Sequence, residues 1–206
     1  RANYTKGRFV HARHTTDSPD WITPSYIVEA ARTVMGGIDL DPMSDAAANT
    51  IVRARRFYTE RDNGLAHSWR GRVFINPPGG LVTEAWIHLN TQRRVSQWIW
   101  VGYSLEQLQT LQSVFPLHPT DFDLCFPDHR IAFIENRAKQ RVRREKLIAK
   151  GRARGANKAA RSLALRLKQG GDLPNSPSHA NYIAYYGLRR AIFRRVFQQI
   201  GRVVMA

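Results

Sequence analysis

Apolar residues recur every three to four positions in the stretch "TPSYIVEAARTVMGG", which begins at residue 23. This spacing predicts a helix with one buried face. Thr23 can cap the start of the helix, and Pro24 suits its first turn because a proline there sacrifices no hydrogen bond. Gly36 and Gly37 predict its end.

Short apolar runs then alternate with further helical patterns. The runs "IDLD", "GRVFINPP" and "QWIWVGY" predict strands, whereas "DAAANTIVRA", "LVTEAWIHL" and "SLEQLQTLQ" predict helices. Strands that alternate with helices indicate an open α/β sheet with parallel strands. Such sheets bind ligands at the carboxyl ends of their strands, so the residues that follow each strand are candidates for chemistry.

The last third of the chain has a different pattern. "LCFPDHRIAFI" and "SHANYIAYYG" each predict one strand, and together they could form an antiparallel pair that closes the sheet. A long basic segment lies between them. Its apolar positions form a narrow stripe at helical spacing, which predicts a helical hairpin broken near Gly151 and Gly155. The chain ends in an amphipathic helix, "LRRAIFRRVFQQI", followed by a short strand.

Charge is concentrated in that basic segment. The chain of 206 residues has 32 Lys or Arg and 16 Asp or Glu, and residues 137–168 hold 13 of the basic residues but only one of the acidic ones, Glu145. A solvated charged helix usually balances its signs along a face. This imbalance favours a polyanionic partner, and we expect nucleic acid.

Composition narrows the class further. The apolar fraction of 43% is enough for one globular core, and no run approaches the length of a membrane span. Cys125 is the only cysteine, so neither an intrachain disulfide nor a cysteine-based zinc cluster can form. We therefore expect a cytoplasmic protein with no membrane partner.

Two strand ends carry residues suited to chemistry. The first, "IDLDPMSD", places Asp39, Asp41 and Asp45 near the end of a strand. Their carboxylates could accept hydrogen bonds from the hydroxyl or ammonium groups of a ligand, or could bind a divalent metal. A capped turn that opens the next helix explains the same residues equally well.

The second strand end, "VFINPP", fits one reaction. The Asn76 side-chain carbonyl beside the Pro77 backbone carbonyl makes a rigid pair of acceptors, and Pro78 stiffens them. Two acceptors suit an exocyclic amine, which has two N–H donors. They favour the pyramidal geometry in which the nitrogen lone pair of adenine can attack. Asn-Pro-Pro also occurs in ordinary turns.

The order of four segments resembles a known family. "WITP", "LDPMSD", "FYTERDNGL" and "WRGRVFINPP" follow one another as in the phage-type DNA N6-adenine methyltransferases, which depend on S-adenosylmethionine. The resemblance covers residues 21–80 well and the two late strands more weakly. It implies a Rossmann-like class I methyltransferase sheet, mostly parallel with a late antiparallel strand pair, to which this chain adds the basic helical hairpin.

The resemblance also implies roles for individual residues. Asn76, Pro77 and Pro78 match the catalytic motif. The positions that match cofactor-binding segments are Trp21, Thr23, Pro24, Asp41, Pro42, Ser44, Asp62, Asn63 and Leu65. Where the family usually has glycines after Ser44, this chain has Asp45 and Ala46.

Position 79 departs from the family pattern, in which an aromatic residue stacks on the target base. Gly79 and Gly80 stand there instead and predict a loop that closes over the substrate. Trp86, Tyr103 and Phe126 are candidates for the missing aromatic ring. His179 and Asn181 are further candidates for a base contact.

These features lead to one hypothesis. A catalytic domain of residues 21–136 and 169–206, preceded by a polar arm over residues 1–20, transfers a methyl group from S-adenosylmethionine to adenine N6 in double-stranded DNA, without a metal. The base is flipped out of the duplex, and sequence specificity is low or short. The hairpin of residues 137–168 binds phosphates. The expected contacts are Arg137, Lys139, Arg141, Arg143, Arg144, Lys146, Lys150, Arg152, Arg154, Lys158 and Arg161.

Other functions fit part of the sequence. A magnesium-dependent nuclease would use Asp39, Asp41 and Asp45 but leaves the Asn-Pro-Pro segment without a role. A non-enzymatic nucleic-acid-binding protein would need only the hairpin. RNA in place of DNA, and N4 of cytosine in place of N6 of adenine, are variants of the methyltransferase hypothesis.

Overall fold

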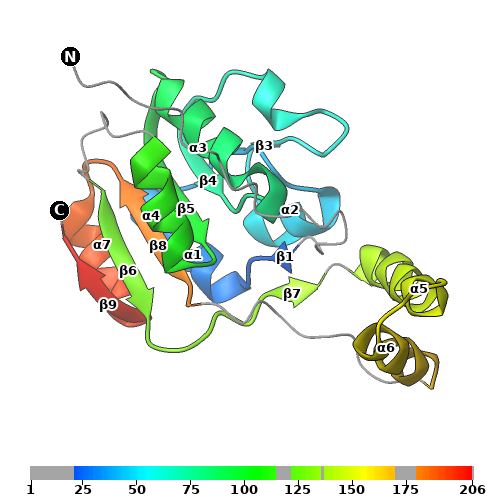
Figure 1. Ribbon diagram of the computed structural model, residues 1–206. Coiled ribbons are helices and arrows are strands. Elements are labelled where there is room, and N and C mark those ends of the chain that lie inside the picture. The colour runs from blue at the N-terminus through cyan, green and yellow to red at the C-terminus, as the bar shows by residue number, and fades with distance from the viewer. Residues whose placement is uncertain (1–20, 115–121, 136, 170–179, 206) are drawn as a thin grey trace, which may run out of the picture.

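A seven-stranded sheet forms the centre of the molecule (Figure 1). The computed structural model describes residues 21–114, 122–135, 137–169 and 180–205; the arm predicted over residues 1–20 lies outside them. In spatial order the strands are β3 (Arg56–Phe57), β2 (Leu40–Asp41), β4 (Gly71–Ile75), β5 (Val95–Gly102), β8 (Tyr182–Tyr186), β6 (Asp123–Pro127) and β9 (Gly201–Val204). A separate antiparallel ribbon pairs β1 (Trp21–Ile22) with β7 (Ile134–Glu135).

The sheet is mixed, and the prediction that it is mostly parallel was wrong. The pairings β3–β2, β2–β4 and β4–β5 are parallel, but β5–β8, β8–β6 and β6–β9 are antiparallel. The antiparallel pair predicted from the late strands is present as β6 and β8. However, β8 also inserts beside β5, and β9 adds a further antiparallel edge. These long-range pairings leave no mark in local periodicity.

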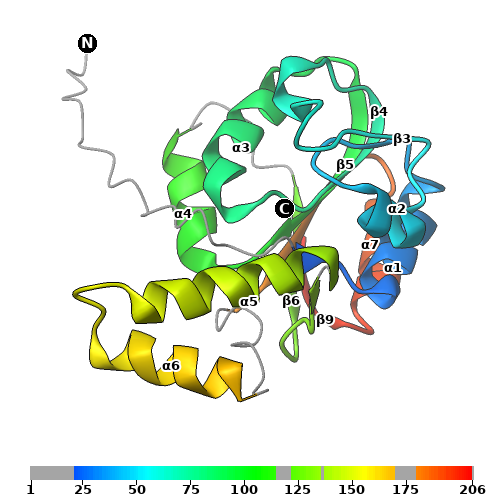
Figure 2. The ribbon, with the colours of Figure 1, turned by 90° about the vertical axis from the view of Figure 1, so that its right-hand side faces the viewer.

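Helices cover both faces of the sheet (Figure 2). One face packs against α1 (Ser25–Met35), α2 (Ala46–Val52) and α7 (Arg190–Phe197), and the other packs against α3 (Val82–Thr91) and α4 (Leu105–Val114). Side chains of successive strand residues point to opposite faces. In β4, Phe74 accordingly joins the first core cluster, whereas Val73 and Ile75 join the second. The fold is α/β, as predicted.

The first helix begins one residue later than its sequence suggests. Pro24, not Thr23, occupies the N-cap position of α1, and no side chain caps the helix there. Thr23 is buried ahead of it. The helix ends as predicted, because Gly36 adopts the left-handed conformation, with φ of 76°.

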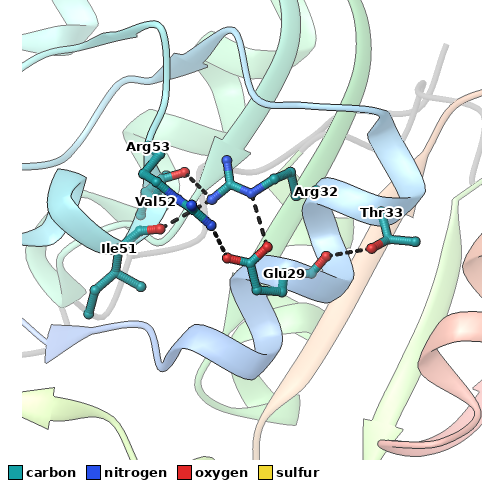
Figure 3. Close-up of polar contacts among 6 residues, drawn as sticks. All are labelled: Glu29, Arg32, Thr33, Ile51, Val52 and Arg53. Atoms are coloured by element: carbon teal, nitrogen blue, oxygen red, sulfur yellow. Dashed lines mark hydrogen bonds and ion pairs between the residues drawn. The ribbon is translucent and has the colours of Figure 1, made fainter.

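Polar contacts brace α1 against α2 (Figure 3). Arg32 donates from Nη2 to the carbonyls of Ile51 and Val52, at 3.2 and 2.8 Å, where α2 ends. Glu29 forms ion pairs with both Arg32 and Arg53. Because α1 follows Thr23-Pro24 and α2 follows the loop after β2, this brace fixes the two loops relative to each other.

The predicted strand "LCFPDHRIAFI" is two strands in different sheets. β6 stops at Pro127, and β7 starts at Ile134 and pairs with β1, so that Glu135 lies opposite Trp21. The bend between them is fixed by the Asp128 backbone N–H, which donates to the carbonyl of Ile200 at 3.1 Å. The basic segment therefore leaves the molecule from the small ribbon, not from the central sheet.

Two helices occupy the basic segment, α5 (Arg137–Arg152) and α6 (Lys158–Lys168), and they are set apart from the sheet beyond β7 (Figure 1). The prediction of a helix break near Gly151 and Gly155 is correct only for Gly155, because the helix continues through Gly151. Gly151 lies within α5, where an added Cβ would approach the Ala164 Cβ to 2.3 Å, so its lack of a side chain lets the helices meet. The break comes later, at Gly155, which has φ of 89°. Among the described helices, none has the length and apolarity to cross a membrane.

Candidate active site

Asn76 directly follows β4 at the carboxyl edge of the sheet and has a fixed orientation. Its amide nitrogen Nδ2 donates to the backbone carbonyl of Trp21 at 2.9 Å. This hydrogen bond turns the nitrogen end of the amide toward β1, so that the oxygen Oδ1, a hydrogen-bond acceptor, faces away from β1. An aspartate could not donate this hydrogen bond when ionised, so the contact explains why an amide suits this position.

The two prolines after Asn76 differ in exposure and in hydrogen bonding. Pro77 is buried, and within the described chain no donor reaches its carbonyl. Pro78 is exposed, and its carbonyl accepts from the Leu81 N–H at 2.8 Å at the start of the short 3-10 helix η2 (Gly79–Leu81). The Asn76 Oδ1 and the Pro77 carbonyl are therefore the acceptors that the segment leaves for a ligand.

Asp41 ends β2 and is a buried carboxyl, with 4% of its surface exposed. Burial raises the pKa of Asp41 to about 7, and the nearby Asp45 carboxylate acts in the same direction, while the Met43 N–H and the Ser44 hydroxyl oppose it. A buried carboxyl with so high a pKa is typical of a functional site, because a cationic or hydroxyl-bearing ligand can compensate for the lost water.

The rest of this loop divides into a cap and an unpaired hydroxyl. Asp45 is the N-cap of α2, and its Oδ1 accepts from the Ala48 N–H at 2.8 Å. The capped-turn interpretation is thus correct for Asp45. The Ser44 Oγ is buried near the Asp41 carboxyl, and it forms no hydrogen bond of ordinary geometry with any described residue. With Asp41, it gives this loop two buried polar groups suited to a ligand.

Residues 58–65 pack directly against the loop after β2. The Tyr58 N–H donates to the Asp41 carbonyl at 3.0 Å, and the Ser44 N–H donates to the Tyr58 carbonyl at 2.9 Å. Gly64 lies so close to Pro42 that an added Cβ would come within 1.8 Å of the Pro42 carbonyl oxygen. The sequence interpretation missed Gly64, although the "DNGL" segment contains it. Its signal is glycine at a close approach of two backbones.

The other residues predicted in "DNGL" have unequal positions. Asp62 is exposed, and its carboxylate accepts from the N–H and hydroxyl of Thr59 at 2.8 and 2.7 Å, which lowers its pKa. This pattern is a local turn. Asn63 is exposed with φ of 49°, and Leu65 is half-buried beside the core. Of the three, Leu65 offers the apolar surface that a ring could contact.

Asp39 does not join the other carboxylates. It precedes β2, at the amino edge of the sheet, and accepts from Arg72 Nε and Nη2 at 2.8 and 2.7 Å. These hydrogen bonds hold the pKa of Asp39 down to about 2. The structure does not assemble the three carboxylates that a nuclease would need, and among the described residues no three His, Cys, Asp or Glu side chains gather as metal ligands.

A cavity lies at the opposite edge of the sheet. A depression of about 500 Å³ at the amino edge is lined by Asp39 and by three arginines, Arg55, Arg56 and Arg70. Apart from Asp39, which the structure separates from the other candidate carboxylates, its lining includes none of the residues predicted to bind the cofactor or the target base. The candidate site at the carboxyl edge is therefore indicated by side-chain placement and not by this cavity.

The comparison with protein families agrees with this arrangement. A family model described as DNA N-6-adenine-methyltransferase (Dam) matches residues 12–149, which is about two thirds of the chain. The chain belongs to this family. No curated protein and no solved structure matches it.

Membership of the Dam family indicates an enzyme that methylates adenine at N6 in DNA. The matched region includes the four segments around Thr23, Asp41, Asn76 and residues 62–65, and it ends within α5. The family was therefore recognised correctly from the order of its motifs. The second hairpin helix and the strands β8 and β9 lie beyond the match.

The hairpin cations are largely exposed, as a phosphate-binding surface requires. Exposed side chains are those of Arg141, Lys146, Lys150, Arg152, Arg154, Lys158 and Arg161. Arg144 is an exception, because it is half-buried and its Nη1 donates to the Leu167 carbonyl at 2.7 Å, where α6 ends. The side chains of Arg137, Lys139 and Arg143 lie outside the described part of the structure.

Asn181 lies at the same edge as Asn76. It precedes β8, whose first residue Tyr182 pairs with Gly102 at the carboxyl end of β5. Only 7% of Asn181 is exposed. Its Oδ1 accepts from the Ile131 N–H at 3.3 Å, and its buried Nδ2 has no partner among the residues that the structure describes. A buried donor of this kind suits a ligand that brings an acceptor. His179 lies outside the described residues.

Proposed function

We propose that this member of the Dam family transfers the methyl group of S-adenosylmethionine to adenine N6 in double-stranded DNA, with the base flipped into the carboxyl edge of the sheet. The single observation that supports the mechanism best is the hydrogen bond from Asn76 Nδ2 to the Trp21 carbonyl. It fixes which end of the amide faces the substrate.

Asn76 and Pro77 hold the target amine. The adenine N6 carries two N–H groups, and the chain presents two acceptors, the Asn76 Oδ1 and the Pro77 carbonyl. Hydrogen bonds to both draw the nitrogen away from the ring plane and direct its lone pair outward. The pair needs no catalytic base, because the proton is lost after the nitrogen has become cationic. Pro78 keeps the backbone next to these two acceptors rigid, since its ring fixes its own φ angle.

The loops after β1 and β2 suit the cofactor. S-adenosylmethionine, when bound, supplies a methyl group on a sulfonium and brings an ammonium group and ribose hydroxyls. Asp41 and Ser44 are the buried polar groups that could pair with such hydroxyls or with the ammonium. Gly64, pressed against Pro42, keeps the neighbouring loop close enough to share the site. Trp21, Thr23 and Pro24 close it from the start of α1, and Leu65 from the other side.

The hairpin binds the DNA backbone. Its exposed cations can replace the counterions that surround phosphates, which gives affinity without reading sequence. We therefore propose low or short sequence specificity. The match includes the first part of the hairpin and ends inside α5, so the division into a catalytic domain and a binding hairpin is part of this proposal.

A flipped base needs contacts that replace its stacking and pairing in the duplex. The Asn181 Nδ2 is buried and has no hydrogen-bond partner among the described residues, and we propose that it donates to the ring nitrogen beside the amine. Cytosine offers the same pattern of amine and adjacent ring nitrogen, so this contact alone does not select adenine. Selection of adenine over cytosine then depends on the size of the pocket.

The decisive experiment measures transfer of labelled methyl groups. Duplex DNA, single-stranded DNA and RNA are each incubated with labelled S-adenosylmethionine and with wild type or Asn76→Ala, and the modified base is identified by chromatography. We expect N6-methyladenine in DNA from the wild type and a loss of about 100-fold or more in Asn76→Ala.

A matched control is available in Asn90→Ala. The Asn90 Nδ2 also donates to a tryptophan carbonyl, that of Trp86 at 2.8 Å, but within α3. This variant should keep its activity. Transfer that survives Asn76→Ala would refute the mechanism, and the absence of transfer from the wild type would favour a protein that only binds nucleic acid.

A further inference from the structure

Position 79 lacks the aromatic residue that the family pattern has there, but an aromatic ring from the end of another strand, β5, lies beside it. Gly79 begins η2, directly after the Asn-Pro-Pro segment. A Cβ added at Gly79 would lie 3.6 Å from the hydroxyl oxygen of Tyr103 and 4.0 Å from its ring carbons, and these are the nearest atoms. The hydroxyl and ring edge of Tyr103 therefore lie directly beside position 79, within ordinary van der Waals distance of a Cβ there.

The backbone on both sides of Tyr103 is constrained by close packing and by a helix cap. It follows Gly102, the last residue of β5, where an added Cβ would lie 2.1 Å from the ring of Tyr182. Only glycine allows Tyr182 to cross the strand at this point. Ser104 comes next and caps α4, since its Oγ accepts from the Gln107 N–H at 3.1 Å. Tyr103 itself is half-buried, so one part of its ring packs on the core and another part remains accessible.

The other two candidate rings are excluded by their positions. Trp86 is 4% exposed and packs edge-on against Trp98 and Trp100, with ring centroids 5.8 and 5.2 Å away. Phe126 lies on β6, which is separated from β4 by both β5 and β8. Three strand spacings of about 4.8 Å place β6 roughly 14 Å from β4. Tyr103 directly follows β5, the strand next to β4, and lies beside Gly79.

We propose that Tyr103 supplies the aromatic surface on which the flipped base stacks, in place of a residue at position 79. This inference deepens the proposed function and depends on it. The ring comes from the end of β5 and the amine acceptors come from the end of β4, so two adjacent parallel strands hold the base between them.

The test compares Tyr103→Phe with Tyr103→Leu. Phenylalanine keeps the aromatic face, whereas leucine fills similar space without it. Stacking contributes about 1–3 kcal/mol per base, which corresponds to about 5- to 150-fold in affinity. We expect Tyr103→Leu to lower kcat/KM for duplex DNA by about 10-fold or more, and Tyr103→Phe to stay within about threefold of the wild type. Binding of S-adenosylmethionine to both variants, measured by calorimetry, verifies that they are folded.

A second substrate separates stacking from packing. In a duplex whose target adenine is mismatched, flipping costs less free energy, so the Tyr103→Leu defect should shrink. A Tyr103→Leu enzyme as active as the wild type, or an equal loss on paired and mismatched targets, would overturn the assignment of Tyr103. Activity that persists in Asn76→Ala would instead overturn the proposed function, so the two failures are distinguishable.

Discussion

The carboxyl edge of the sheet and the basic hairpin differ in how their candidate functional side chains are held. At the carboxyl edge, two positions, 76 and 64, are each fixed by a contact with a distant segment. Asn76 donates to Trp21, and Gly64 presses against Pro42. In the hairpin, most cations are exposed, and α5 and α6 meet along a thin seam at Gly151. In the proposed function, catalysis at the edge depends on the position of a few side chains, whereas DNA binding by the hairpin depends on the number of its charges.

This difference predicts how each region responds to substitution. A site fixed by close contacts should fail after one change, because a displacement of about 1 Å can cost about 100-fold in rate. A surface that acts through summed charge should lose affinity in small steps, since each phosphate contact adds a similar amount. The following predictions begin with the largest expected loss of DNA affinity and end with the smallest.

The largest effect is expected from neutralising four exposed hairpin cations together. The set is Lys146→Gln, Lys150→Gln, Arg152→Gln and Lys158→Gln. If each contacts one phosphate, the slope of log K against log salt should fall by about 3 to 4, and DNA affinity at 0.15 M salt by about 100- to 1,000-fold. Affinity should be measured by fluorescence anisotropy over a salt series.

A matched control set uses exposed cations outside the hairpin. These are Arg93→Gln, Arg94→Gln, Arg195→Gln and Arg202→Gln. The control protein has the same net charge as the hairpin variant, so a purely global charge effect would lower both affinities equally. Equal losses would contradict a role for the hairpin as the DNA-binding surface.

Two glycines allow the regions to be disrupted separately. Gly64→Ala would place a Cβ 1.8 Å from the Pro42 carbonyl, and Gly151→Ala would place one 2.3 Å from the Ala164 Cβ. Each clash should cost about 1–3 kcal/mol of stability. We expect Gly64→Ala to weaken cofactor binding and spare DNA binding, and Gly151→Ala to do the reverse. Calorimetry and anisotropy on both variants measure this, and loss of both functions in either variant would contradict the separation.

The buried carboxyl of Asp41 predicts an unusual dependence of stability on pH. Its pKa rises from an ordinary 3.8 to about 7 on folding, so the folded protein binds this proton more strongly than the unfolded chain. Stability should therefore fall as pH rises from about 4 to 7 and then level off, by up to about 4 kcal/mol. Asp41→Asn should remove this dependence, as measured by urea unfolding at pH 5 and pH 8.

Ligand binding sharpens this prediction for Asp41. If the cofactor pairs its ammonium or hydroxyl groups with the carboxylate, its affinity should rise as pH increases through about 7, because ionisation then completes the contact. The Asp41→Asn affinity should be weak and flat with pH. A wild-type affinity that is independent of pH between 6 and 8 would exclude Asp41 from the cofactor site.

Much of this arrangement could be predicted from local sequence. The helices α1, α3 and α7 and the strands β4 and β5 follow their apolar spacing, and the motif order identified the family. The two-residue strands β1 and β3 carry too little pattern to be recognised. The mixed sheet could not be predicted either, because the insertion of β8 between β5 and β6 is a long-range pairing.

The candidate site divides in the same way. The acceptor role proposed for Asn76 follows from its residue type, but its hydrogen-bond partner Trp21 lies 55 residues earlier in the chain. Asp39 and Asp41 look equivalent in sequence, yet a strand carries one at its amino end, paired with Arg72, and the other at its carboxyl end, buried. Tyr103 could not be preferred to Trp86 until its contact with Gly79 was known.

The smallest effect is expected within the hairpin, between two cations that its sequence does not distinguish. Arg144 donates to the Leu167 carbonyl, whereas Lys146 is exposed. Arg144→Gln should lower the free energy of unfolding by about 1 kcal/mol through loss of this hydrogen bond, and should change the salt slope of DNA binding by clearly less than one. Lys146→Gln should leave stability unchanged and reduce the slope by about 0.9. Urea unfolding and anisotropy on both variants test this, and equal changes in slope would mean that Arg144 contacts phosphate while it also holds α6. Within a surface whose proposed DNA affinity comes from its total charge, Arg144 would then differ from the other cations, because a specific hydrogen bond holds it in place.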